Sequence, residues 1–225
     1  MQVQLPYDVG AFNKLPSLNE AHTQFMAMNG LKVLEEFLHS LFLRYQMTEK
    51  FGMTLLHSHF VLNDHEILVE ANGTSTPWDL RGADPTPTGF AKYDGAIKPS
   101  SWMVTDDHLR AFEFYFDPNT GTPGIDPSVS FVEDLSTILK ANNLSNVLGL
   151  YQIADASTGQ IEVTEGRANV TFPFDKVAHP DVINSDKYIQ TSWQFPSTST
   201  GKPQARNWCA KVCIKAHIEL HGEKP

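Results

Sequence analysis

Short segments rich in β-branched and aromatic residues follow one another through the second half of the chain, and they constrain the fold more than any other feature. Gly, Ser, Asp and Pro separate these segments, which read NVLGLYQIAD (146–155), QIEVTE (160–165), ANVTFPF (168–174) and KYIQTSWQF (187–195). HLRAFEFYF (108–116) has the same character. Segments of this length and composition, bounded by turn residues, are typical of consecutive β-strands. We therefore expect one antiparallel sheet or an open β-barrel.

The last of these segments, NWCAKVCIKAHIELHGE (207–223), predicts a further strand. Apolar residues occupy every second position from Trp208 to Leu220, which is the period of a strand. The opposite face carries Cys209, Lys211, Cys213, Lys215, His217, Glu219 and His221. Cys and His recur there every four residues, and such positions stand roughly 13 Å apart along a strand, so they cannot all surround one ion. At most one or two of them can join a site built elsewhere, and His217 is the residue that we favour as a ligand.

The N-terminal part predicts a long helix. Ser17 and Glu20 have capping-box spacing, which marks a helix start. Leucines and aromatic residues at three- and four-residue intervals continue the helical pattern beyond Gly30, which can break or kink the helix, and Gly52 supplies a stop. These residues are expected to face the core.

A second helix is predicted over 128–140. Asp126 can cap it and Pro127 suits its first position, while the apolar residues within it form one face. Together the segments predict a single α+β domain spanning 1–225, in which the sheet or barrel has the long N-terminal helix and the second helix packed outside it.

Composition excludes several classes of partner. The chain is 41% hydrophobic and 19% charged, with 17 basic and 26 acidic residues and a formal charge of -9, and it has no basic stretch to bind phosphates, so we expect no nucleic-acid partner. It also lacks a signal-peptide pattern and a membrane-length apolar run. We therefore expect a cytoplasmic protein without a membrane partner. Two cysteines provide no disulfide framework.

The stretch TLLHSHFVLNDHEILVE (54–70) carries the most chemistry. A two-residue turn at Asn63-Asp64 would pair its two halves as a β-hairpin. Because side chains alternate along a strand, one face would then be mostly apolar. The other face would carry His57, His59, Glu66 and Glu70.

Two histidines at i and i+2 of a strand project side by side, and a carboxylate across the ladder completes three ligands. This 2-His-1-carboxylate set suits non-haem Fe(II), which we favour, and it also serves Zn, Mn or Ni. His57, His59 and Glu70 are the preferred metal ligands, and Glu66 is the competing carboxylate. The alternative interpretation is a half-buried hairpin whose polar face simply meets water.

The residues Gly52, His57, His59, Glu66 and Gly73 stand in the order Gly, His-x-His, Glu, Gly, with six residues between Glu66 and Gly73. This order resembles the first metal motif of the cupin superfamily, although no second motif with Pro-x-Gly and a following His is present. The resemblance implies a small β-barrel and a divalent metal bound by the two histidines and a glutamate. It also implies a further histidine from a later strand, for which His217 is the candidate.

Other candidate residues are few. His108 and Arg110 stand at a strand entrance, where Arg110 can anchor a substrate, although a surface turn is the simpler interpretation. The stretch 72–101, rich in Pro, Gly and Thr, resists assignment and is a candidate lid. Cys209 or Cys213 beside His217 is a possible nucleophile.

These features lead to three hypotheses of function. The first is a metal-dependent enzyme acting on an organic small molecule, most specifically a non-haem iron oxygenase or a metal-dependent isomerase or lyase. The second is a non-catalytic protein that binds a small ligand or another partner. The third is a cysteine-dependent transferase or hydrolase.

Overall fold

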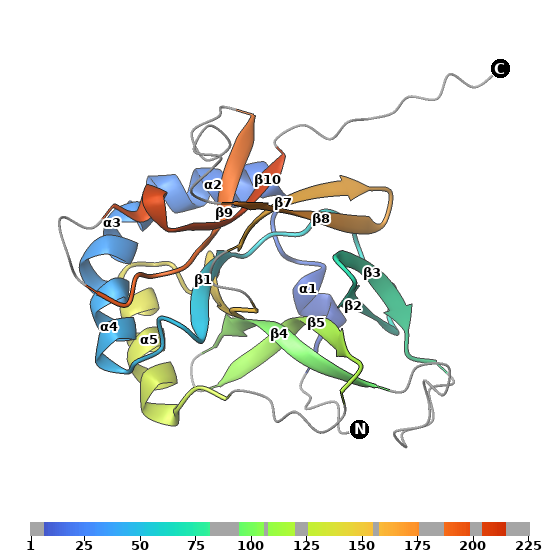
Figure 1. Ribbon diagram of the computed structural model, residues 1–225, viewed down its shortest axis with the longest axis horizontal. Coiled ribbons are helices and arrows are strands. Elements are labelled where there is room, and N and C mark those ends of the chain that lie inside the picture. The colour runs from blue at the N-terminus through green and yellow to red at the C-terminus, as the bar shows by residue number, and fades with distance from the viewer. Residues whose placement is uncertain are drawn as a thin grey trace.

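The strands close into a barrel (Figure 1). The computed structural model describes residues 7–81, 95–105, 108–119, 126–154, 158–175, 187–198 and 204–214. Its strands are β1 (Phe51–Leu55), β2 (Glu66–Ala71), β3 (Thr74–Asp79), β4 (Ala96–Val104), β5 (Leu109–Asp117), β6 (Leu148–Gln152), β7 (Thr158–Glu165), β8 (Ala168–Asp175), β9 (Tyr188–Trp193) and β10 (Cys209–Ile214).

The barrel is closed because β1 pairs with β6 on one side and with β9 on the other. Around the barrel the order is β1-β6-β4-β5-β2-β3-β8-β7-β10-β9. Most neighbours are antiparallel, but β2 with β5 and β7 with β10 are parallel. The prediction of a β-rich fold is confirmed, whereas the prediction of an open or wholly antiparallel sheet is wrong. Within the described ranges every strand therefore has a neighbour on both sides and none is a free edge, which is the physical advantage of closure.

Most predicted strands form. The segment 108–116 and the four segments within 146–195 correspond to β5, β6, β7, β8 and β9. The predicted C-terminal strand forms in part as β10, and its residues 215–220 lie outside the described residues. The stretch 72–101 is different, because it contains β3 and most of β4 and is therefore not simply a loop. Its central residues, 82–94, lie outside the described residues.

Most helical segments gather at one side of the barrel, whereas the short helix nearest the N-terminus lies apart from them, beside β2 and β5 (Figure 1). They are α1 (Val9–Phe12), α2 (Leu18–Ala27), α3 (Gly30–Val33), a π-helical turn η1 (Leu34–Leu38), α4 (His39–Arg44), α5 (Val129–Ala141) and a 3-10 turn η2 (Ala205–Trp208). The capping box at Ser17 is confirmed.

The long N-terminal helix is not confirmed. The helical run breaks before Gly30, where Asn29 adopts a left-handed conformation with φ of 53°. A Cβ at Gly30 would lie 2.1 Å from the Phe25 ring, so the glycine allows this close approach. The second part ends at Arg44, and Gly52 belongs to β1, so the predicted stop is wrong.

The second predicted helix is confirmed as α5, although its cap differs. Ser128, and not Asp126, is the N-cap, and its hydroxyl accepts a hydrogen bond from the Phe131 N–H at 3.4 Å. None of the helices in the described part of the chain combines the length and apolar character that a membrane-spanning helix needs.

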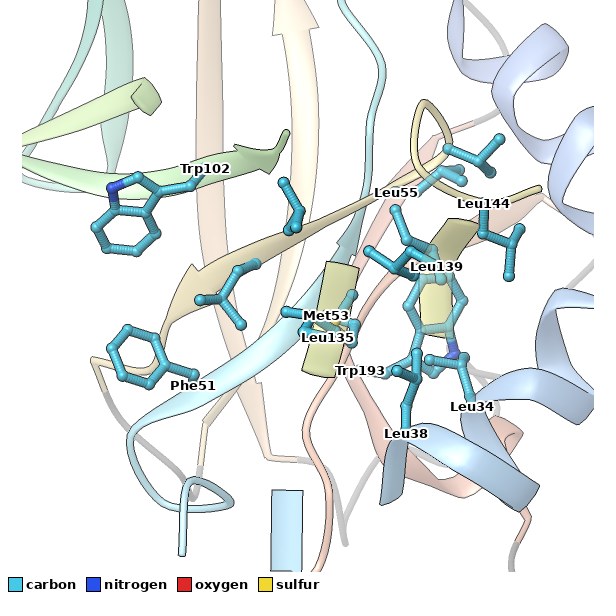
Figure 2. Packing of buried hydrophobic residues seen from close by; sticks show 14 of the residues in the cluster. Leu34, Leu38, Phe51, Met53, Leu55, Trp102, Leu135, Leu139, Leu144 and Trp193 are labelled. Atoms are coloured by element: carbon cyan, nitrogen blue, oxygen red, sulfur yellow. The ribbon is translucent and has the colours of Figure 1, made fainter. Parts of the chain in front are cut away.

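The main apolar core lies between the helices and the barrel wall. Figure 2 shows Leu34 and Leu38 of η1 beside Trp193, and Leu135 of α5 close to Met53. We call this cluster the helix-facing core. It includes Leu148 and Leu150 of β6 and Phe51, Met53 and Leu55 of β1. The side chains of Thr54 and Tyr151, which alternate with these residues, instead line a cavity, so the two faces of β1 and β6 have opposite character.

Candidate metal centre

The predicted hairpin about Asn63-Asp64 does not form. β2 pairs with β3 through a turn at Asn72-Gly73, and residues 56–65 are not a strand. Asn72 and Gly73 have φ of 53° and 80°, and Asn-Gly is the sequence best suited to a turn that needs positive φ at both central residues. The register predicted for the hairpin is therefore wrong, and the reason is that a better turn follows nine residues later.

The segment that carries the two histidines is held in place by backbone and amide contacts. The Asn13 side chain donates to the Leu62 carbonyl and accepts from the Leu62 N–H, both at 2.8 Å. The Ser58 N–H donates to the Pro16 carbonyl at 3.0 Å. The loop after β1 is thus tied to the N-terminal segment, and His57 and His59 have defined positions without a strand partner.

The parallel ladder between β7 and β10 supplies two more donor groups. Cys213 is opposite Glu162 in this ladder, and Lys211 is opposite Gln160. Residues two apart on a strand share a face, so Glu162 and Gln160 point to the same side as their partners. This pairing joins parts of the chain that are about fifty residues apart.

His57, His59, Glu162 and Cys213 converge, and their donor atoms all lie within 4.8 Å of one another. His57 Nε2 is 3.1 Å from His59 Nε2, which is 3.1 Å from Glu162 Oε1. Cys213 Sγ lies 3.3 Å from the same oxygen and 3.7 Å from His57 Nε2. Donors held tetrahedrally by one ion are about 3.4 Å apart. The four residues therefore have the types and the separations of a metal-ligand set.

The tautomer of His57 favours metal binding. Its Nδ1 lies 2.8 Å from the Leu55 carbonyl oxygen, which can only accept, so Nδ1 carries the hydrogen and Nε2 keeps its lone pair. Burial, and then the neighbouring His59, lower the pKa of His57 to about 4. A neutral imidazole fixed by a backbone carbonyl is the usual state of a histidine ligand.

Lys211 orients the carboxylate. Its ammonium donates to Glu162 Oε2 at 3.0 Å, while Oε1 faces His59. Burial by itself raises the pKa of Glu162, but the Lys211 charge, followed by His59, outweighs it and holds the pKa well below its ordinary value. The side chain of Glu162 is only 5% exposed. The carboxylate is therefore ionised and buried, with one oxygen committed to Lys211.

Cys213 is poorly suited to act as a free nucleophile. It is fully buried, and burial, followed by the charge of Glu162, raises the pKa of its thiol well above the usual range. The reactive form of cysteine is the thiolate, so this environment favours the thiol. A bound cation would reverse that preference, because metal coordination deprotonates a thiol.

The two glutamates predicted as ligands lie elsewhere. Glu66 forms an ion pair with Arg167 and also accepts from Asn63 N–H at 2.8 Å. Glu70 accepts from the Gly73 N–H at 2.6 Å and lines the cavity described below. Neither belongs to the four-residue group. His217 lies outside the described residues.

His108 and Arg110 contribute to a different hollow from the one that Lys211 lines. Both line a groove of about 800 Å³ that also contacts Lys14 and Met103. Arg110 Nη1 lies 3.4 Å from Asp8 Oδ2. Neither residue belongs to the four-residue group, so a catalytic role for them in that group gains no support from their position.

The barrel interior contains a cavity of about 480 Å³, which we call the lumen cavity. Its lining residues come from β1, β2, β4, β5, β6, β7, β9 and β10, so it lies inside the ring of strands. Lys211 connects it with the candidate metal centre, because this side chain lines the cavity and bonds Glu162. A cavity of this size suits a small organic molecule.

Sequence reasoning missed Glu162 and chose His217 ahead of Cys213. Glu162 alternates with Ile161 and Val163 in β7, whose sequence is TGQIEVTE, and a polar residue at such a position is typical of any half-buried strand, so no local signal marks it as a ligand. No local pattern reveals that β7 pairs with β10. No protein-family model, curated protein or solved structure matches this chain.

Proposed function

We propose that this protein is a metal-dependent enzyme that acts on an organic small molecule. One observation supports this proposal above all: four side chains of ligand type, from the loop after β1, β7 and β10, bring their donor atoms within 4.8 Å of one another. Glu162 and Cys213 are buried and the two histidines are partly buried, and ionisable groups in such a place are costly unless they are paired or bind a cation. In this proposal His57, His59 and Glu162 are the ligands, and Cys213 is a fourth donor.

The donor set bears on the choice of metal. Two imidazoles and a carboxylate suit Fe(II) or Zn, whereas a cysteine sulfur next to them favours a softer ion. We therefore propose Zn²⁺ ahead of Fe(II). With zinc, a Lewis-acid reaction such as an isomerisation or an elimination fits better than an oxygenase reaction, which requires a redox-active metal.

The protein groups around the centre have separate tasks. When bound, the ion supplies Lewis-acid chemistry. The Leu55 carbonyl fixes the orientation of His57, and Lys211 holds one oxygen of Glu162 so that the other faces the histidines. The lumen cavity beside Lys211 provides the volume for a substrate.

Metal analysis of the purified full-length chain without a histidine tag tests the proposal. We expect about one zinc or iron ion per chain, and its loss in His59→Ala and in Glu162→Gln, since each variant removes a ligand. Glu66→Gln is the matched control, because Glu66 pairs with Arg167 away from the group, and it should keep the metal. Trace metal that is the same in all four proteins would refute the proposal.

The lumen cavity also supports a second candidate function, a non-catalytic protein that binds a small ligand. A closed barrel that holds one small ligand needs no metal. The two functions separate if a ligand of the lumen cavity is recovered chemically unchanged from the metal-loaded protein, which only the non-catalytic function predicts.

A further inference from the structure

The wall of the lumen cavity is built mainly of groups that both donate and accept hydrogen bonds. Hydroxyls come from Thr54, Ser192, Tyr115 and Tyr151, which lie on four different strands, and Gln160 adds an amide. Ser192 donates to Thr54 at 3.1 Å, and each hydroxyl keeps further capacity for hydrogen bonding. Groups of this kind best match a ligand whose own groups donate and accept, and hydroxyls do both.

The charges of the wall disfavour an anion. Among the described lining residues the one cation is Lys211, and its ammonium is already paired with Glu162 at 3.0 Å. Two carboxyl groups, Glu70 and Glu113, also face the cavity. Each has one oxygen engaged, with the Gly73 N–H at 2.6 Å and the Ser101 hydroxyl at 2.7 Å. The second oxygen of each is available to accept from a ligand hydroxyl.

An aromatic ring provides an apolar contact in this polar wall. The ring of Tyr151 lies directly over Gly52, where an added Cβ would come within 2.4 Å of both that ring and the Trp193 carbonyl oxygen. Any other residue at position 52 would therefore displace the ring or the strand. Ring faces of this kind contact the C–H groups of a ligand, while the phenol hydroxyl reaches its polar groups.

From this wall we infer that the lumen cavity binds a neutral, hydroxyl-rich small molecule of the monosaccharide or polyol class. This inference rests on the proposed function, since it names the substrate class of the same site. Hydroxyl and amide groups from several strands bond the ligand hydroxyls, Glu70 and Glu113 accept from them, and Tyr151 covers an apolar face. The ligand lies beside Lys211 and hence next to the candidate metal centre.

Saturation-transfer difference NMR with the full-length protein tests the inference, because this method detects weak binding. The neutral probes are D-glucose, D-xylose and myo-inositol. Gluconate is the anionic probe, and D-glucosamine at mildly acidic pH is the cationic one. We expect at least one neutral probe to bind more tightly than both charged probes. Tyr151→Phe and Glu113→Gln should each weaken it roughly tenfold, as expected for one lost hydrogen bond to a buried partner.

Controls keep the test separate from folding and from metal binding. Tyr45→Phe also removes a phenol hydroxyl, but Tyr45 bonds Asp134 far from the lumen cavity, so it should bind like the wild type. His59 does not line the cavity, so His59→Ala should keep the probe even where it loses the metal. Circular dichroism spectra establish that each variant folds.

The outcomes are distinguishable. Three results would each overturn the inference. The first is that no neutral probe receives saturation transfer, and the second is that gluconate or glucosamine binds more tightly than the neutral probes. The third is that Tyr151→Phe and Glu113→Gln bind the neutral probe as well as the wild type does. Loss of the probe in His59→Ala would overturn the claim that the wall itself binds the ligand. If metal analysis fails while a neutral probe binds as expected, the proposed function falls and the lumen cavity remains a polyol site.

Discussion

The two faces of the barrel wall differ sharply in chemistry. On β6, Leu150 belongs to the helix-facing core and is fully buried, whereas its neighbour Tyr151 lines the lumen cavity. On β1 the same division separates Met53 from Thr54. Alternation along a strand lets one segment serve both purposes. The comparison teaches that stability comes mainly from apolar burial between the wall and the helices, while polar and ionisable groups are gathered inside.

The largest expected effect distinguishes these two faces on a single strand. Leu150→Ala should lower the free energy of unfolding by about 4 kcal/mol, since it removes a fully buried side chain and leaves a cavity. Tyr151→Phe, one residue away, should cost less than about 1 kcal/mol, because it keeps the ring and removes one hydroxyl. Urea unfolding of both variants measures the difference. Equal losses would contradict the assignment of the helix-facing core as the main source of stability.

The next effect concerns the charges inside the barrel. Lys211→Met should destabilise the metal-free protein by about 3 kcal/mol, because it leaves the buried carboxylate of Glu162 without its counter-charge. The double variant Lys211→Met, Glu162→Gln should recover much of the lost stability, because it no longer contains the unpaired carboxylate. Lys32→Met is the matched control: Lys32 pairs with Glu36 at 3.8 Å with both side chains mostly exposed, so it should change stability by less than about 0.5 kcal/mol. If Lys211→Met lowers the free energy of unfolding as little as Lys32→Met does, the pair of Lys211 and Glu162 is not effectively buried.

The smallest effect concerns the carboxylate first considered as a ligand. Hydrogen bonding to Arg167 lowers the pKa of Glu66 to about 2. Because the folded pKa lies below the ordinary value, the pair stabilises the protein above about pH 5, and this contribution is lost as pH falls towards 2. The Arg167 side chain is 45% exposed, so we expect the pair to contribute less than about 1 kcal/mol to the free energy of unfolding.

Comparison of wild type with Glu66→Gln in urea at neutral pH and at about pH 3 checks this contribution. The difference in unfolding free energy should be greater at neutral pH. A difference that grows on acidification would have the wrong sign and would contradict the pairing of Glu66 with Arg167.

Much of the local structure could be predicted because its causes lie within a few residues. The capping box of α2, the helix α5 and the strands β5 to β9 follow from caps, turn residues and short-range periodicity. The H-x-H pattern also drew attention to His57 and His59, and both residues belong to the four-residue group, but their role as ligands stays a prediction. The hairpin failed because two turn candidates competed and only Asn72-Gly73 combines positive φ with a glycine.

By itself, then, the sequence determined where strands and helices form and which residues carry chemistry. Only the tertiary structure decided which strands are neighbours, that they close into a barrel, and that Glu162 and Cys213 stand beside the histidines. His59 and Glu162 are 103 positions apart in the chain, and His57 and Cys213 are 156 apart. Contacts over such separations depend on strand pairing and closure of the whole barrel, and no pattern of neighbouring residues records that choice.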